Sequence, residues 1–168
     1  ISPVYYSVLA RSGFFPVEEL QTFRLLDSRL QGHPTTHEKL PGVRIASGSL
    51  GQGMSVALGA AAAKKLNQDD SLIYSLHGDG ELQEGQNWEA ILYAGSKGVD
   101  NMIATIDVNG KQIDGSTDDV LHMGDLQEKF QAFGWKVITI KNGNDISSII
   151  DGLNQAKKET NSGKPVCV

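Results

Sequence analysis

Short apolar runs alternate with segments whose apolar residues recur at helical spacing. The runs at residues 71–77, 102–108 and 135–140 predict strands, and a fourth strand begins at residue 166. The segments predicted as helices are residues 3–10, 17–26, 54–66, 81–95, 126–133 and 145–158. Because strands alternate with helices, we expect an α/β fold with a doubly wound, mostly parallel sheet and helices on both faces.

Polar residues follow two of these strands, at the point where each ends. Gly78-Asp79-Gly80 follows the first strand, and Asn109 follows the second. Either motif by itself is ordinary turn chemistry. Neighbouring parallel strands, however, bring their carboxyl ends to one edge of the sheet, where ligands of open α/β folds bind. Carboxylate and amide oxygens suit Mg²⁺ or Ca²⁺, and small glycines admit a phosphate to the next helix. The pattern therefore predicts a site for a metal and a diphosphate.

Composition narrows the class of protein. The 168 residues suffice for one domain, which we expect to span residues 1–168 and to be truncated at both ends. A net charge of −5 gives no basic surface for nucleic acid. No run of 18 apolar residues predicts a membrane span, and no signal-peptide pattern opens the chain. The single cysteine, Cys167, fits a buried strand position and a reducing, cytoplasmic compartment.

Several runs together resemble the thiamine diphosphate signature of transketolases. They are His77–Gly85 (HGDGELQEG), 106–109 (IDVN), 113–115 (IDG), 47–53 (SGSLGQG), 32–34 (GHP) and 132–135 (AFGW). The pairing of Gly78-Asp79-Gly80 with Asn109 is shared by thiamine enzymes generally, whereas ELQEG, GSLGQG and IDG are typical of transketolases. The likeness is greatest to the N-terminal subunits of bacterial split transketolases, in which the two halves are separate chains.

The resemblance implies a thiamine diphosphate-binding fold and a set of ligands for the cofactor and Mg²⁺. Asp79, Asn109 and the carbonyl of Lys111 would bind the metal. In the diphosphate loop, Gly78 and Gly80 would bring backbone close to the cofactor, with the N–H of Gly80 directed at the diphosphate.

The same resemblance implies further cofactor contacts. Glu81 would begin the helix behind the diphosphate. Gly48 would lie with its backbone near the aminopyrimidine, and the Leu50 side chain would lie against the rings. A simple core position is the alternative for Leu50.

Two side chains carry expectations outside the cofactor contacts. His33 matches a histidine that contacts the hydroxyls of the donor sugar, with a solvated loop histidine as the alternative. Glu84 matches a carboxylate of the dimer interface, with a glutamate favoured by the helix dipole as the alternative. His77 is expected to be a hydrogen-bonded core residue, and His37 a surface residue.

The glutamate and aromatic shelf that activate the cofactor belong, in this family, to a pyrimidine-binding half that the chain lacks. We therefore expect inactivity without that half, in a homodimer or heterotetramer that moves a two-carbon ketol unit between sugar phosphates. The alternatives are a deoxyxylulose-phosphate synthase, the α chain of a 2-oxo acid dehydrogenase, and a non-catalytic cofactor- or partner-binding domain. A Rossmann domain is disfavoured because no GxGxxG spacing is present.

Overall fold

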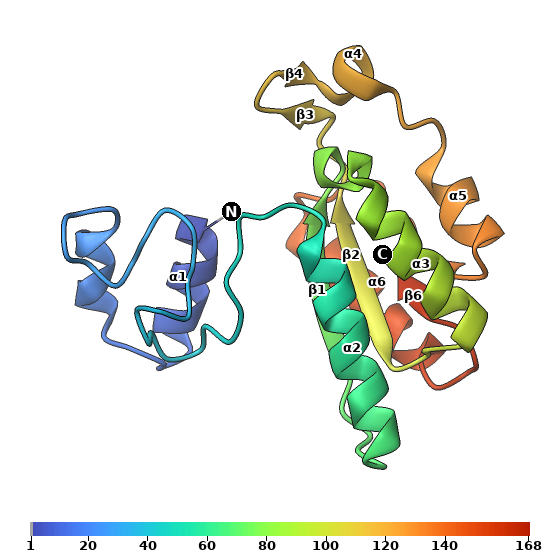
Figure 1. Cartoon of the computed structure of the whole chain (residues 1–168), viewed down its shortest axis with the longest axis horizontal. Coiled ribbons are helices and arrows are strands. Elements are labelled where there is room, and N and C mark those ends of the chain that lie inside the picture. Colours follow the sequence, from blue (N-terminus) through green and yellow to red (C-terminus); the bar gives the residue numbers. More distant parts are fainter. Residues whose placement is uncertain (1) are drawn as a thin grey trace. The chain divides into compact units, whose positions relative to one another are not determined.

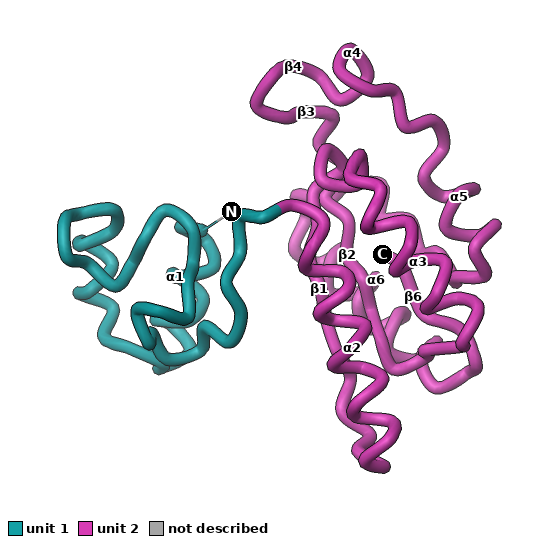
Figure 2. Tube along the Cα trace, viewed as in Figure 1, with its two compact units in different colours: residues 1–49 teal, residues 50–168 magenta. Residues whose placement is uncertain are grey.

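The computed structural model describes residues 2–168 and divides into two compact units, Ile1–Ser49 and Leu50–Val168 (Figure 2). Each unit has a hydrophobic core of its own. The two units are defined by contacts between residues of this chain. They do not decide whether residues 1–168 form a single domain, which stays a prediction.

In the first unit, the loop that contains Gln31 and Gly32 is hydrogen-bonded to a short helix. Helix α1, Ser2–Arg11, buries Tyr6 and Leu9 against apolar residues from the segments that follow it. The hydroxyl of Tyr6 donates to the carbonyl of Gln31 (2.8 Å), and the hydroxyl of Ser2 donates to the carbonyl of Gly32 (2.7 Å). These two bonds fix the backbone that leads directly into His33.

The helix predicted at residues 17–26 is wrong in type and in length. The structure has only the 3₁₀ helix η1, Val17–Thr22, followed by turns in which Arg24 and Asp27 adopt positive φ (62° and 61°). Leu25 and Leu26 remain exposed, so a longer helix would bury no apolar face here.

The second unit is a parallel sheet in the order β1-β2-β6-β5 (Figure 1). Its strands are β1 Ile73–Gly78, β2 Met102–Asp107, β6 Val166–Cys167 and β5 Lys136–Val137. Side chains of three helices pack with Ala104 and Cys167 on one face: α2 Gln52–Leu66, α3 Gly85–Lys97 and α5 Leu126–Ala132. Helix α6, Ile146–Glu159, packs Ala156 against Ile103 and Val166 on the other. The predicted parallel sheet with helices on both faces is confirmed.

The single helix predicted at residues 81–95 is in fact two. The 3₁₀ helix η2, Gly80–Gln83, ends at Glu84, which is extended (φ −71°, ψ 119°), and α3 begins at Gly85. Asn87 and Trp88 donate side-chain hydrogen bonds to the carbonyls of Glu81 (2.6 Å) and Leu82 (2.7 Å). Side chains of α3 thus satisfy the carbonyls that a continuous helix would have used.

Two further segments differ from the prediction. The strand expected at residues 135–140 pairs in the sheet only through β5, although the N–H of Ile138 still donates to Cys167 (2.9 Å). The antiparallel hairpin of β3, Lys111–Gln112, with β4, Gly115–Ser116, was not predicted, nor was the short helix α4, Thr117–Leu121. No helix within residues 2–168 is long and apolar enough to cross a membrane.

Candidate functional site

The ends of β1 and β2 lie side by side. The two strands pair in parallel from Ile73 with Met102 to Gly78 with Asp107, and the N–H of Asp79 donates to the carbonyl of Asp107 (3.1 Å). Asp79 and the loop that contains Asn109 therefore leave the sheet at one edge, as the sequence predicted.

The carboxylate of Asp79 is buried and organises this edge. Its side chain accepts hydrogen bonds from the N–H of Gly80 (2.9 Å), the N–H of Gly110 (2.8 Å) and the hydroxyl of Thr117 (3.4 Å). A carboxylate offers about four lone-pair positions, so at least one remains. No Lys, Arg or His among residues 2–168 forms an ion pair with it. A buried carboxylate with a free lone pair and no cationic partner suits a metal ion.

The amide of Asn109 is exposed and held in one orientation. Its Oδ1 accepts the N–H of Lys111 (2.9 Å), and its Nδ2 donates to the carboxylate of Asp107 (3.1 Å). These bonds assign the amide oxygen and leave it a second lone pair. Lys111 begins β3, with its side chain exposed.

The chemistry of this donor set fits Mg²⁺. A carboxylate, an amide oxygen and a backbone carbonyl are hard ligands, and Mg²⁺ completes its shell with water and phosphate oxygens. No cluster of three or more His, Cys, Asp or Glu that could hold a metal occurs within residues 2–168. The predicted set is of a different kind, because only one of its ligands is an acidic side chain.

Gly80 has little room around it. A Cβ there would lie 3.1 Å from the Cβ of Gln112, whereas a Cβ at Gly78 would meet nothing within 4 Å. Gln83 of η2 is bonded to helix α4, because its amide donates to the carbonyls of Thr117 (3.2 Å) and Leu121 (3.0 Å). Gln83 and Thr117 were not singled out from the sequence, because their partners lie more than thirty residues away.

Glu81 contacts both the glycine-rich segment and the first strand. Its Oε1 accepts the N–H of Gly51 (3.1 Å), and its Oε2 lies 3.3 Å from Nδ1 of His77 without the geometry of a hydrogen bond. Burial alone would raise the pKa of the Glu81 carboxyl. The contacts with His77 and Gly51 outweigh burial, and they hold this pKa below its usual value.

The structure corrects the expectation for His77 in part. The side chain is a core residue, only 2% exposed, but neither ring nitrogen makes a hydrogen bond with residues 2–168. Leu50, by contrast, is 57% exposed, which removes the core alternative for that residue. Its proposed contact with the cofactor stays a prediction.

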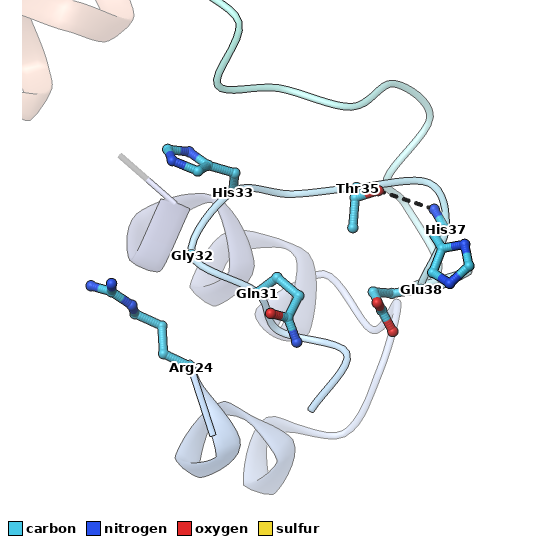
Figure 3. A pocket seen from close by; sticks show the side chains of 7 residues that line it. All are labelled: Arg24, Gln31, Gly32, His33, Thr35, His37 and Glu38. Atoms are coloured by element: carbon cyan, nitrogen blue, oxygen red, sulfur yellow. Dashed lines mark hydrogen bonds between the residues drawn. The ribbon is translucent and has the colours of Figure 1, made fainter. Parts of the chain in front are cut away.

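His33 and Gly48 touch within the first unit. A Cβ at Gly48, whose φ is +103°, would lie 2.7 Å from Nδ1 of His33. His33 also borders an open hollow of about 600 Å³, lined besides by Arg24, Gln31, Gly32, Thr35, His37 and Glu38. Figure 3 shows the Arg24 side chain alongside Gly32, and the N–H of His37 bonded to the Thr35 hydroxyl (3.2 Å). The loop thus presents polar side chains to the hollow.

Glu84 is exposed and stands at the N-cap of α3, where its side chain makes no capping hydrogen bond. It forms no ion pair with residues 2–168. The carboxylate is therefore available to a partner, and the interface role stays a prediction.

Fold and site together define a parallel α/β domain with a buried carboxylate, an oriented amide and a glycine turn at the carboxyl edge of its sheet. The family described as "Transketolase, thiamine diphosphate binding domain" matches residues 1–168. The chain belongs to this family and has its α/β thiamine diphosphate-binding fold.

Similar proteins include subunits of two-part transketolases. The chain is 44% identical to an apulose-4-phosphate transketolase subunit of Actinobacillus succinogenes, covering 96% of this chain and 56% of that protein. It is 39% identical to the 6-deoxy-6-sulfo-D-fructose transketolase subunit SqwG of a Clostridium species, covering 97% and 58%. The chain thus spans little more than half the length of these relatives.

Solved transketolases share the fold. The enzyme of Campylobacter jejuni superposes with a TM-score of 0.86 at 39% identity, and that of Leishmania mexicana with 0.88 at 34% identity. Each match covers 98% of this chain and 26% of the other.

Proposed function

We propose that this chain is the diphosphate-binding half of a transketolase, which moves a two-carbon ketol unit between sugar phosphates. Family membership over residues 1–168 supports the cofactor, thiamine diphosphate. The observation that carries the proposal is the buried carboxylate of Asp79, which lies at the paired strand ends with a free lone pair and no cationic partner in residues 2–168.

In this proposal each group has one task. Asp79, Asn109 and the carbonyl of Lys111 hold Mg²⁺, and Gly80 offers its N–H to the diphosphate. When bound, thiamine diphosphate supplies the carbanion that takes up the two-carbon unit.

Other residues complete the proposed half-site. Glu81 lies in η2, behind the diphosphate, and Gly78 lets the backbone of the diphosphate turn come close to the cofactor. Gly48 approaches the aminopyrimidine with its backbone, and Leu50 lies against the rings. His33 donates to or accepts from the hydroxyls of the donor sugar.

The activity requires a second half. A pyrimidine-binding chain or domain supplies the glutamate that activates the aminopyrimidine ring, and the pair assembles as a homodimer or heterotetramer in the cytoplasm. The match to subunits of two-part transketolases supports this arrangement.

The test is the metal dependence of cofactor binding by the assembled protein. Asp79→Ala should abolish Mg²⁺-dependent binding of thiamine diphosphate in calorimetry. The variant lacks the buried carboxylate that accepts the N–H groups of Gly80 and Gly110. Asp151→Ala is the matched control, since Asp151 is an exposed acid on α6. An Asp79→Ala assembly that binds the cofactor as tightly as the control would refute the metal assignment.

A further inference from the structure

Three separate segments of the second unit meet at the side chain of Glu81. The carboxylate receives the N–H of Gly51, the residue before α2, and it faces Nδ1 of His77 at the end of β1. Glu81 itself lies in η2, directly after Gly80 and two residues after Asp79. One carboxylate thus joins the start of α2, the end of β1 and the diphosphate turn.

The imidazole of His77 packs against the first turn of α2, next to this junction. Its Cε1 would lie 3.4 Å from a Cβ at Gly53, so the ring fills the space beneath the first turn of α2. The side chain is 2% exposed, which excludes direct contact with a substrate. His77 therefore touches two elements at once: the carboxylate of η2 and the glycine turn of α2.

A buried polar pair is a poor way to add stability. Removing an imidazole and a carboxylate from water is expensive, and well-packed apolar residues often serve stability as well or better. What such a pair does provide is a fixed geometry, because each group needs its partner at one position. The contacts between Gly51, Glu81 and His77 define the separation of the two backbone segments that flank the candidate cofactor site.

We propose that His77 and Glu81 are positioning residues that hold the glycine-rich segment beginning at Leu50 against the diphosphate turn. The pair keeps the backbone of Gly51 next to η2, so that Leu50 and Gly80 have a fixed relation before the cofactor arrives. Preorganisation of this kind improves affinity by reducing the ordering required on binding. The inference rests on the proposed function, because it concerns affinity for thiamine diphosphate.

The first measurement needs no cofactor. Hydrogen exchange of the Gly51 amide, followed by NMR in the 168-residue chain, reports whether its bond to Glu81 persists. Glu81→Ala should accelerate exchange at Gly51, whereas Glu81→Gln keeps an acceptor oxygen and should restore protection. His77→Leu should also accelerate exchange, because Glu81 then loses the partner that orients it. Unchanged exchange in both Glu81→Ala and His77→Leu would overturn the proposal.

The second measurement is the dissociation constant of thiamine diphosphate in the full assembly at saturating Mg²⁺. Glu81→Ala should raise it by roughly threefold to tenfold, the range expected for one lost hydrogen bond. His77→Leu should raise it in the same direction, because the contact that orients Glu81 is lost. The double variant should lose less than the product of the two single effects, since both act through one junction. Independent, multiplicative effects would contradict a shared role.

Ser75→Ala is the matched control. Ser75 lies two residues before His77 on β1 and also has a buried hydroxyl without a hydrogen-bond partner in residues 2–168. Its loss should leave both Gly51 exchange and cofactor affinity unchanged, and a Ser75→Ala effect equal to that of His77→Leu would reduce His77 to a packing residue. If the parent assembly binds no thiamine diphosphate, the proposed function fails, while the exchange measurement still decides the junction.

Discussion

Gly48 constrains the position of His33 at the scale of single residues. Its positive φ (+103°) is a conformation that side chains rarely adopt, and a Cβ there would overlap the imidazole of His33. A glycine is thus required for the backbone to pass this close to the ring. The contact fixes one side of His33 and leaves the other toward the hollow that it borders.

We expect His33→Ala to weaken transition-state binding more than cofactor binding. If His33 bonds the hydroxyls of the donor, its loss removes roughly 0.5–1.5 kcal/mol, or about a threefold to tenfold decrease in kcat/KM. The dissociation constant of the cofactor should stay the same. The measurement is steady-state kinetics of the assembled enzyme alongside calorimetry of cofactor binding.

His37→Ala is the control for this prediction, because His37 is exposed and lines the same hollow. If the parent and His33→Ala have equal kinetic constants, His33 is a solvated loop residue and does not bind the donor sugar. A decrease confined to cofactor affinity would instead place His33 with the cofactor contacts.

The sequence predicted the residues whose relation depends on sheet topology alone. Asp79 and Asn109 follow strands that pair in parallel, so their common edge could be inferred from the pattern of strands and helices. The contact of Glu81 with Gly51 and His77 could not be inferred. It depends on the angle at which η2 leaves the strand, and no local rule gives that angle.

At the scale of elements, helix α3 lies very close to the backbone of the turn that follows α5. A Cβ at Gly95 would lie 1.8 Å from the carbonyl oxygen of Phe133, and the indole of Trp135 donates to the carbonyl of Ile91 on the same helix (2.8 Å). The helix therefore packs directly on the backbone of the turn that follows α5. The sequence predicted most of α3 from its apolar spacing, but not its start, because side chains of Asn87 and Trp88 decide where η2 ends.

Gly95→Ala should destabilise the protein, although alanine favours helices. The intrinsic gain is about 0.5–1 kcal/mol, but the overlap with backbone forces the helix to shift, and overpacking of this kind costs about 1–3 kcal/mol. Gly59→Ala on α2 is the matched substitution, because a Cβ there meets nothing within 4 Å. Urea unfolding followed by circular dichroism should show Gly59→Ala at or above the parent and Gly95→Ala below it. Equal stability of the two variants would mean that the contact with Phe133 relaxes freely.

At the scale of the whole molecule, both compact units contribute residues to the proposed half-site. The two units carry different groups, with His33 and Gly48 in the first and Asp79, Asn109 and Glu81 in the second. The sequence could predict where Asp79 and Asn109 lie, because each belongs to a local motif at the end of a strand. It could not predict the two compact units, because the 31–48 segment has no composition that distinguishes a linker from a loop.

Glu84 is the residue at which assembly can be tested. Its carboxylate is exposed, caps no backbone N–H of α3 and forms no ion pair within residues 2–168. If it faces another carboxylate across a dyad, the two share a proton, since close like charges disfavour double ionisation. Glu84→Ala then leaves one buried acid without its partner and loosens the interface.

We therefore expect Glu84→Ala to raise the dissociation constant of the dimer and to weaken cofactor binding only through that loss. Glu84→Gln should retain much of the association, because an amide can still hydrogen-bond the facing acid. Glu89→Ala is the control, since Glu89 is another exposed acid of α3. Analytical ultracentrifugation over a dilution series measures the dissociation constant. A Glu84→Ala protein that dissociates no more readily than the control, yet binds cofactor poorly when fully assembled, would place Glu84 in the cofactor site instead.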